Sequence, residues 1–524
     1  MLVNIHTAAL NGLSVMPVSV EISTRSGSGA GGLGRSENFQ MVGLPDGAVR
    51  EARTRVQSAL QNSRVRMPQM AVTVNFAPAD VRKEGSGYDL PLAVGLLAAA
   101  GLLDAAAADG TLFVGELSLD GTLRPVRGAL PVALRARADG FRRIVLPGEN
   151  AAEAAVAEGL EVCGAGSLAD VIALLRGTPC LQPELPSWRE AFAAAQSQSD
   201  CDFADVRGQL HVKRAFEIAA AGGHNLIMVG PPGCGKSMMA KRLPTILPPL
   251  TIEESLETTQ IHSVAGRLAE GQALVVRRPF RAPHHTVSDV ALIGGGANLQ
   301  PGEVSLAHNG VLFLDELPEF SRTALETMRQ PLEDGRISIS RARYNAELPS
   351  RFMLVASMNP CPCGYYGDPT HRCVCTPGQI QRYLNKVSGP LLDRIDIQVE
   401  CTALSYNDLS NAPAGESSAC IRERVLKARK IQERRFLEIK GVYCNAQMSE
   451  KMIRQFAEPD ENSLNLLRIV MERLKLSARA YNRILKVART IADLEGRENV
   501  QSQHIAEAIG YRNLDRGDWA ERGI

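Results

Sequence analysis

The sequence is poor in aromatic residues, lacks an excess of either charge and contains no apolar run long enough to cross a bilayer. Aromatic residues make up 5% of the 524 positions, and 58 Lys and Arg against 57 Asp and Glu leave a formal net charge of +1. This balance gives no global sign of a nucleic-acid or anionic-membrane partner, so any basic surface must be local. The longest uncharged apolar stretch, residues 90–103, is too short to span a membrane. We therefore expect no membrane association.

Signals for export and for a disulfide framework are also missing. The N-terminal residues have neither a basic region nor a signal-peptide apolar run. The 11 cysteines are an odd number in a large chain, whereas disulfide-rich folds are typical of small secreted domains. These features predict a cytoplasmic protein without a disulfide framework.

Three regions of the chain differ in composition, and 524 residues exceed what one hydrophobic core usually organises. Residues 1–180 combine alternating, strand-like runs with helix-like segments and predict an α/β or α+β domain. Prolines and polar residues at 181–204 predict a linker. A second α/β region follows at 205–400, and a charged, mostly helical region occupies 401–524.

A phosphate-binding motif begins at residue 230. Eight residues fit G-x-x-x-x-G-K-[ST] at every fixed position: Gly230, Pro231, Pro232, Gly233, Cys234, Gly235, Lys236 and Ser237. The apolar run 226–229 predicts the preceding strand, and 237–243 predicts the helix whose N-terminus faces the phosphates. Lys236 supplies a positive charge at the β/γ-phosphates and Ser237 a hydroxyl ligand for Mg²⁺. The motif therefore predicts ATP and Mg²⁺ as cofactors.

Two further strand ends carry polar side chains suited to that chemistry. The apolar run 311–314 ends in Asp315 and Glu316, which is the pattern of a Walker B strand. Asp315 is predicted to hold Mg²⁺ and Glu316 to polarise the attacking water. A third apolar run, 352–358, ends at Asn359, whose amide is predicted to orient water near the γ-phosphate.

These elements together resemble those of AAA+ ATPases, which implies that Asn359 is the residue known there as sensor 1. Residues 391–396, L-L-D-R-I-D, are similar to a segment of the magnesium-chelatase and MCM branch in which the arginine is a finger for the neighbouring subunit. The resemblance implies that role for Arg394 and a sensor 2 role for Arg479, whereas Arg483 is expected to be an ordinary surface or salt-bridged arginine. A finger acting in trans implies a ring, by analogy a homo-hexamer.

The run 278–310 indicates which branch of the AAA+ ATPases the chain resembles. It contains R-P-F-R-A-P-H-H-T, then G-G-G, then P-G-E-V-S-L-A-H-N-G. The chain is similar over essentially its whole length to the magnesium-chelatase-like AAA+ family, and more narrowly to its ComM/YifB branch. This implies a ribosomal-S5/Lon-like α+β domain, an AAA+ P-loop NTPase core and a C-terminal helical lid. His284, His285 and His308 lack a carboxylate or Cys at useful sequence spacing and are expected to form structural hydrogen bonds.

Residues 333–344 alternate as a hairpin should, with Arg341 and Arg343 near its tip. In the related MCM helicases the matching hairpin points into the central channel and touches DNA. The resemblance implies phosphate contacts for both arginines, which need charge but no sequence-specific geometry. A hairpin with two exposed, solvated arginines fits the sequence nearly as well.

Four cysteines lie close together in the sequence: Cys361, Cys363, Cys373 and Cys375. Four thiolates in a short loop are sufficient for a tetrahedral structural zinc, although the spacing within each pair is tighter than the common C-x2–4-C. We expect Zn²⁺ here, with free thiols as the alternative and His371 as a replacement for one cysteine. A metal would stiffen the segment between Asn359 and Arg394.

The N-terminal domain resembles the ribosomal-S5-like fold of the Lon protease domain and of RadA. A plausible alignment places Gly87 at the serine position of Lon and Leu130 where the partner lysine would lie. Ser86 is one residue out of register, with no lysine nearby to activate it. The resemblance therefore implies no protease activity.

The resemblance implies a ring-shaped helicase or translocase in which ATP hydrolysis drives single-stranded or branched DNA through a basic channel. In the ComM branch this activity promotes branch migration during recombination of incoming DNA in natural transformation, alongside recombination proteins. The alternatives are a magnesium-chelatase motor subunit, a Lon-like protease and a protein remodeller. The Lon-like domain and the cysteine cluster favour the DNA motor over the chelatase, whose ATPase subunit is expected to lack both. The missing dyad disfavours the protease, and the remodeller stays open because channel loops set the substrate of a motor.

Overall fold

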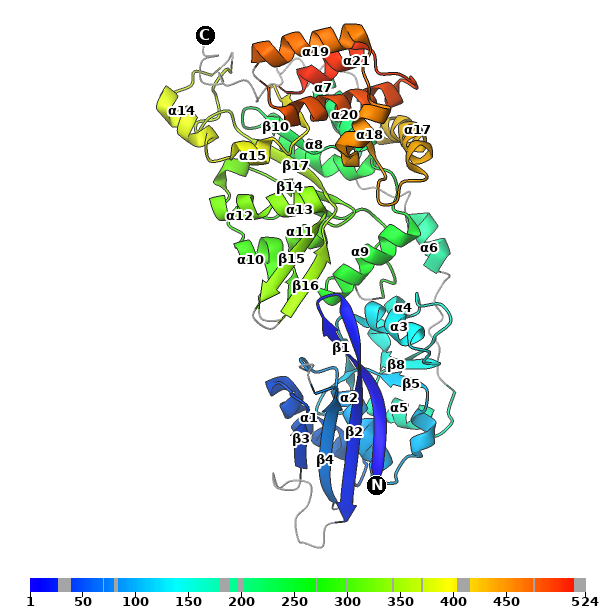
Figure 1. Cartoon of the computed structure of the whole chain (residues 1–524). Helices are drawn as coiled ribbons and strands as arrows, with labels where there is room; N and C mark the ends of the chain where they lie inside the picture. Colours follow the sequence, from blue (N-terminus) through cyan, green and yellow to red (C-terminus); the bar gives the residue numbers. More distant parts are fainter. Residues whose placement is uncertain are drawn as a thin grey trace.

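The computed structural model of the chain contains two large β-sheets in separate parts of an elongated molecule, with helices at the far end of the second (Figure 1). The described residues are 1–26, 39–68, 70–79, 83–179, 188–195, 201–269, 271–296, 299–341, 344–368, 371–402, 415–474 and 476–512. The architecture is a mixed α/β fold, as expected from the alternation of strand-like and helix-like segments.

The N-terminal sheet has seven strands in the order β3-β4-β2-β1-β5-β8-β9. Its strands are β1 (Leu2–Asn11), β2 (Ser14–Ser26), β3 (Phe39–Val42), β4 (Met70–Ala77), β5 (Thr111–Phe113), β8 (Arg143–Pro147) and β9 (Glu161–Ala165). The pairs β1–β2 and β2–β4 are antiparallel and the others are parallel. A two-stranded ribbon of β6 (Glu116–Leu117) and β7 (Leu123–Arg124) lies outside this sheet.

Helix α2 (Asp89–Ala99) forms the centre of the N-terminal core. Every residue of α2 is buried, and its apolar side chains pack with the inward-facing residues of β1 and β2. Asp89 at its first turn is charge-paired with Arg55 of α1 (Gly47–Asn62), through two hydrogen bonds of 2.7 and 2.8 Å. The remaining helices of this region are α3 (Ala129–Ala138), α4 (Ala151–Ala154) and α5 (Leu168–Leu175).

The second sheet has five parallel strands in the order β11-β14-β17-β10-β18. Its strands are β10 (Leu226–Val229), β11 (Phe280–Arg281), β14 (Val311–Leu314), β17 (Met353–Met358) and β18 (Ile397–Glu400). Each residue of β10, β14 and β17 is buried, as the continuous apolar runs predict for the centre of a parallel sheet. All carboxyl ends therefore lie at one edge, where ligands bind in sheets of this kind.

Nine helices and two hairpins surround this sheet in the described residues. The helices are α7 (Leu210–Gly222), α8 (Lys236–Arg242), α9 (Ile252–Val264), α10 (Asp289–Ile293), α11 (Glu303–Leu306), α12 (Arg322–Thr327), α13 (Arg329–Asp334), α14 (Pro377–Leu384) and α15 (Gly389–Leu392). The hairpins pair β12 (Gly294–Gly295) with β13 (Gln300–Pro301), and β15 (Arg336–Arg341) with β16 (Tyr344–Pro349).

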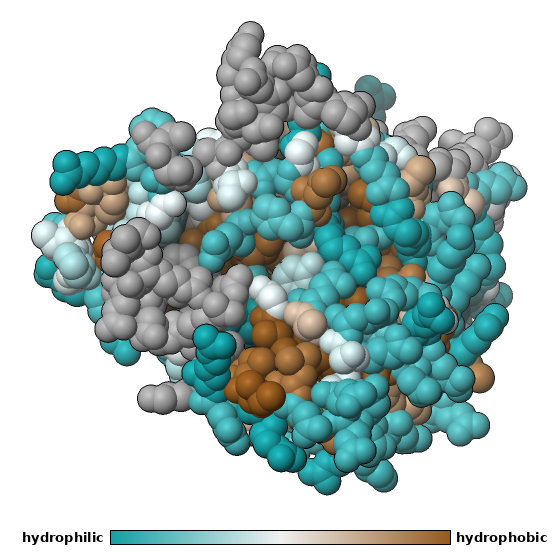
Figure 2. Space-filling model, turned by 90° about the horizontal axis from the view of Figure 1, so that it is seen from above, coloured by the Kyte–Doolittle hydropathy of each residue, from teal (hydrophilic) through white to brown (hydrophobic). Residues whose placement is uncertain are grey.

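The C-terminal helices share one hydrophobic core with the second sheet. They are α17 (Ser418–Phe436), α18 (Glu450–Phe456), α19 (Glu461–Leu474), α20 (Ala478–Leu494) and α21 (Ser502–Gly510). Val425 of α17 and Ile484 of α20 belong to the same buried cluster as Phe216 of α7 and Met228 of β10. Figure 2 views this end of the molecule, whose outer surface is largely hydrophilic with small hydrophobic patches.

The interval 181–204, expected to be a linker, includes helix α6 (Trp188–Ala195). Phe192 of α6 is buried with Leu130 of α3 and with Leu250 and Leu274 of the second α/β region, and Trp188 packs beside them. The i, i+4 spacing of Trp188 and Phe192 provides an apolar helix face that the polar composition of the interval concealed. This segment therefore joins the two sheet-containing regions by packing.

An ion pair between a buried carboxylate and a partly exposed arginine connects the C-terminal helices to the second sheet. Asp396, immediately before β18, accepts hydrogen bonds from Arg483 of α20 and, at 3.3 Å, from His224 after α7. Burial alone would raise the pKa of Asp396, but the charge of Arg483 and the hydrogen bond with His224 lower it far below its usual range. Arg483 is thus an ion-paired structural arginine.

We predict that Asp396→Asn destabilises the protein by about 1.5–3 kcal/mol, because it removes the buried carboxylate with which the partly exposed Arg483 is hydrogen-bonded. Urea denaturation at neutral pH measures the loss. The folded-state pKa of Asp396 is depressed, so its contribution is present above the unfolded pKa of about 4 and falls as the pH drops further. Asp393→Asn is the matched control, since Asp393 lies 3.9 Å from the exposed Arg479. Equal stability of the two variants would contradict the prediction.

Candidate functional site

The P-loop connects β10 to α8 at the carboxyl edge of the second sheet. Gly233 (φ +79°) and Gly235 (φ +88°) adopt left-handed conformations that the loop requires and that favour glycine. Lys236, the first residue of α8, is buried and donates to the main-chain oxygens of Gly230 at 2.7 Å and Pro231 at 2.9 Å. The ammonium group is therefore held inside the loop that the motif predicts to surround phosphates.

The Walker B carboxylate lies against the P-loop hydroxyl. Ser237 Oγ donates to Asp315 Oδ2 at 2.7 Å, although 78 residues separate them in sequence. Ser357 on the neighbouring β17 donates to the other oxygen, Asp315 Oδ1. A hydroxyl and a carboxylate at this separation are suitable oxygen ligands for Mg²⁺. The role of Ser357 was not visible in the sequence, because a serine inside an apolar strand gives no signal of its partner.

Asn359 follows β17 and completes the cluster. Its Oδ1 lies 3.2 Å from Nζ of Lys236, so the strand-end amide and the P-loop lysine contact each other directly. The loop after Asn359 packs on the P-loop and on Asn359 itself. A Cβ on Gly364 (φ +87°) would lie 2.7 Å from Cδ of Pro232 and 3.9 Å from Cγ of Asn359. Gly364 is therefore required for close approach of this loop to the P-loop.

The P-loop also contains a thiol with altered acidity. Hydrogen bonding with Cys401 after β18 and the positive charge of Lys236 lower the pKa of the buried Cys234 to about 6, against the effect of burial. The same hydrogen bond and burial raise the pKa of Cys401 well above its usual range. Cys234 is therefore the more acidic of the two thiols.

Glu316 is exposed, whereas Lys236 is buried. The backbone of Glu316 is left-handed (φ +54°), and its side chain is 55% exposed at the end of β14. The Glu316 carboxylate lies 3.4 Å from Nδ1 of His285. His308 also meets a carboxylate, Glu257 at 3.2 Å, whereas His284 contacts Thr286. The sequence concealed both carboxylate partners because they come from other elements of the fold.

The two arginines assigned to a neighbouring active site lie apart from the P-loop. Arg394 is 5% exposed, forms an ion pair with Glu333 of α13 and donates to the main chain of Pro390 at 2.5 Å. Arg479 is 63% exposed at the start of α20 and lies 3.9 Å from Asp393. Neither hydrogen-bonds to the P-loop within the described residues. Arg394 is thus buried and paired within its own chain, whereas the resemblance implied an arginine finger available to a neighbouring subunit.

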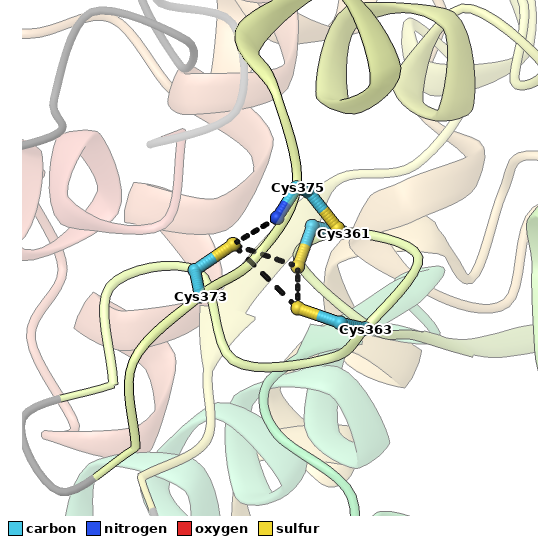
Figure 3. A group of neighbouring side chains, drawn as sticks. All are labelled: Cys361, Cys363, Cys373 and Cys375. Carbon is cyan, nitrogen blue, oxygen red and sulfur yellow. Dashed lines mark hydrogen bonds between the residues drawn. The ribbon is translucent and has the colours of Figure 1, made fainter.

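The four cysteines of the loop after Asn359 converge on one point (Figure 3). Their Sγ atoms all lie within 4.8 Å of one another, with separations of 3.3 Å for Cys361–Cys363, 3.5 Å for Cys363–Cys373 and 3.7 Å for Cys361–Cys373. A tetrahedral zinc with bonds of about 2.3 Å needs sulfur separations of about 3.8 Å, which these values approach. His371 stacks on Tyr365 and is not part of the cluster.

Two other sequence predictions concern the β15–β16 hairpin and the N-terminal domain. Arg343 and the side chain of Arg341 lie outside the described residues, so the structure places only the β15–β16 hairpin that carries them. In the N-terminal domain, Ser86 contacts Glu116, and Leu130 is buried with α6 and the second α/β region. The position expected for the protease lysine is therefore filled by an apolar contact between regions.

The strand order, the P-loop and the adjoining strand-end carboxylate are those of an AAA+ P-loop protein. Family models agree: "Magnesium chelatase, subunit ChlI" matches residues 202–409, "Subunit ChlI of Mg-chelatase" matches 32–150, and "Magnesium chelatase, subunit ChlI C-terminal" matches 415–512. The chain belongs to the magnesium-chelatase ChlI family of AAA+ proteins.

Curated relatives match nearly the whole chain. Competence protein ComM of Haemophilus influenzae is 43% identical over 513 residues, covering 98% of this chain and 97% of the relative. YifB of Escherichia coli is 44% identical over 514 residues, with the same coverage. A more distant match, DNA replication licensing factor mcm6 of Dictyostelium discoideum, is 26% identical over 36% of this chain and 18% of its own length. No described helix is both long and apolar enough to cross a membrane.

We predict that the purified protein contains about one zinc ion per chain and that Cys363→Ser loses most of it. The loss follows from removing one of four thiolates that converge on a single point. Elemental analysis after dialysis measures the metal content. Cys420→Ser is the matched control, because Cys420 is exposed and outside the cluster. A folded wild-type protein without metal would count against the zinc site.

Proposed function

We propose that this protein is an ATP-dependent, ring-forming DNA helicase or translocase that promotes branch migration when incoming DNA recombines during natural transformation. The contact network of Lys236, Ser237, Asp315 and Asn359 carries the proposal. It occurs in a chain that matches a competence protein, ComM, over nearly its full length. The P-loop supports ATP as the energy source, and the relative supports the process that uses it.

The site residues have separate roles in the proposed hydrolysis. Lys236 neutralises the β/γ-phosphates, and Asn359, in contact with it, orients water beside the γ-phosphate. Mg²⁺ bound by Ser237 and Asp315 would supply positive charge at the phosphate oxygens. Glu316, exposed at the end of β14, polarises the attacking water. The chemistry is mostly positioning and charge stabilisation, so small displacements of these groups matter.

Arg394 and Arg479 act on the site of a neighbouring subunit in this proposal, which requires a ring, by family analogy a homo-hexamer. Arg394 then has to leave Glu333, with which it is paired in the single chain. Assembly would compensate by offering the phosphate charge of the neighbour in place of the carboxylate. This exchange makes hydrolysis dependent on assembly.

Single-stranded and branched DNA are the proposed substrates. The β15–β16 hairpin carries Arg341 and Arg343, which are proposed to contact phosphates in the central channel. The name of one distant relative, a DNA replication licensing factor, supports a DNA substrate. Recombination proteins are the proposed partners of such a motor.

A magnesium-chelatase motor is the second candidate, because all three family models carry that name. One of them covers residues 32–150, so an N-terminal domain does not by itself separate this chain from chelatase subunits. The four-cysteine cluster remains the feature that favours the DNA motor. A protein remodeller built on the same ring is a third candidate, and an unfolding assay with a tagged protein distinguishes it.

We predict that the wild-type protein, with ATP and Mg²⁺, displaces a strand from forked and three-stranded DNA, and that Lys236→Ala abolishes this activity. Arg341→Ala should weaken DNA binding. It should also reduce the slope of log binding constant against log salt concentration by about one, because one phosphate contact is lost. Gel-based strand displacement and binding titrations at several salt concentrations measure these effects. Arg336→Ala is the control, because Arg336 lies on the same hairpin but pairs with Glu347 at 3.2 Å. A wild type that neither binds DNA nor displaces a strand would overturn the DNA motor.

A mixing experiment tests whether Arg394 acts as an arginine finger on the ATP site of a neighbouring subunit. Arg394→Ala should lower the ATPase rate at least about 10³-fold, which is the usual contribution of an arginine finger. Lys236→Ala should be similarly inactive, because it removes the P-loop lysine. Mixed in equal amounts, the two variants should regain part of the activity, since some interfaces combine an intact P-loop with an intact arginine. Steady-state phosphate release measures the recovery. An inactive mixture that forms rings by light scattering would exclude Arg394 as a finger in trans.

A further inference from the structure

The turn between β1 and β2 reaches from the N-terminal sheet to the second α/β region. The register pairs Asn11 with Ser14, so Gly12 and Leu13 form a two-residue turn. Gly12 has the left-handed conformation (φ +60°) that tight hairpin turns require of their first residue. In Figure 1 the tip of this hairpin lies against the β15–β16 hairpin. Two hairpins that are far apart in the sequence therefore meet in space.

The contact between the two hairpins is close and apolar. A Cβ on Gly12 would lie 3.2 Å from Cβ of Ala346 and 4.0 Å from Cδ2 of Leu348. Because Gly12 has no side chain, the backbone of the turn lies directly on the hairpin. Leu13 packs on the buried cluster that contains Ile339 and Leu348, and it is the one described residue of the N-terminal domain in that cluster. The N-terminal domain thus adds an apolar side chain to the core of the second α/β region.

The turn supports the β15–β16 hairpin near the end that carries Arg341. Ala346 pairs with Ile339, two residues before the pair of Arg341 with Tyr344. At about 3.3 Å per residue, the contact lies roughly 7 Å from that pair. Within the described residues, β15 and β16 form a sheet without a third strand, and a two-stranded hairpin is marginally stable unless it packs on another element. The β1–β2 turn is such an element.

The domain that carries the turn is fixed to the core at a second place. Ser263 Oγ, in α9, donates to Oε2 of the buried Glu153 at 2.6 Å, and the main-chain N–H of Gly128 donates to the oxygen of Ser263 at 3.1 Å. Leu130 of α3 is buried beside these groups with Leu250. Since β1 and β2 are also inner strands of the seven-stranded sheet, the turn is a stiff extension of an anchored body.

We propose that the β1–β2 turn is a positioning element that holds the β15–β16 hairpin in a fixed orientation for contact with the DNA backbone. An unsupported hairpin samples many orientations, and ordering it on DNA costs conformational entropy. Packing of Leu13 orders the hairpin before DNA arrives, which favours binding. This role rests on the proposed DNA motor. It gives the N-terminal domain a part in that motor that requires no DNA contact of its own.

Hydrogen exchange followed by mass spectrometry tests the support without any substrate. Leu13→Asp should speed exchange of the main-chain amides of β15 and β16 at least about tenfold, because a charged side chain is not stable in the apolar cluster. Leu13→Met, which is similar in volume, should keep wild-type protection. Met16→Asp is the matched control, since Met16 is 37% exposed on the same hairpin. Unchanged exchange in Leu13→Asp, or a loss of protection spread equally over β10 and β14, would overturn the proposal.

DNA assays test what the support does. Leu13→Asp should weaken binding of forked DNA at least about fivefold and slow strand displacement in proportion. Its ATPase rate without DNA should stay within about twofold of wild type, since the contacts of Lys236 and Asp315 are elsewhere. Leu13→Met should restore both DNA activities. A parallel loss of ATPase activity, or unchanged DNA binding in Leu13→Asp, would overturn the role of the turn.

A double-mutant cycle shows whether Leu13 acts through the hairpin. In a background of Arg341→Ala and Arg343→Ala, adding Leu13→Asp should weaken DNA binding less than about twofold more, because the contact that it positions is already lost. Fully multiplicative losses would overturn the role. A wild-type protein that binds no DNA would instead overturn the proposed function, whereas the exchange measurement would still decide whether Leu13 holds the hairpin.

Discussion

The parallel pairing of β10, β17 and β14 is the constraint on which the candidate site depends. Its register aligns Val229 with Met358 and Leu314 with Ala356, so the three strands end together at one edge. Residues more than a hundred positions apart therefore meet, as Lys236 and Asn359 do at 3.2 Å. Because hydrogen bonds along buried strands resist slippage, the spacing of the polar groups is as rigid as the sheet.

The cysteine loop extends this rigidity beyond the sheet. It leaves the end of β17 after Asn359 and returns against the P-loop, where Gly364 allows contact with Pro232. A metal held by four thiolates would stabilise a loop that has little regular structure of its own. The loop therefore links a proposed structural metal to the position of the nucleotide-binding loop.

The C-terminal helices are tied to the same sheet by both packing and charge. Their apolar residues share a core with α7 and β10, and Asp396 pairs with Arg483 across the boundary. Leaving an unpaired buried charge is costly, so these helices do not separate from β18 without a large loss of free energy. Regions that differ in composition along the chain thus behave as one packed unit around the site.

The P-loop, the Walker B strand and the proximity of the four cysteines could be predicted from sequence, because each is a local pattern. A strand, a glycine-containing turn and a helix follow one another within about twenty residues, and their chemistry is encoded in that order. The composition also indicated an α/β fold with a helical C-terminal region. Helix α6 was missed because two aromatic residues within a polar interval produce only a weak periodic signal.

The sequence by itself determined which side chains are candidates for binding phosphate and metal, and only the tertiary structure decided which of them meet. Three side-chain contacts join residues from different elements: Ser357 with Asp315, His285 with Glu316 and Glu333 with Arg394. No local pattern encodes such contacts, because they depend on strand order, register and packing of segments distant along the chain. For the same reason, the burial of Arg394 within its own chain emerged only from the folded structure.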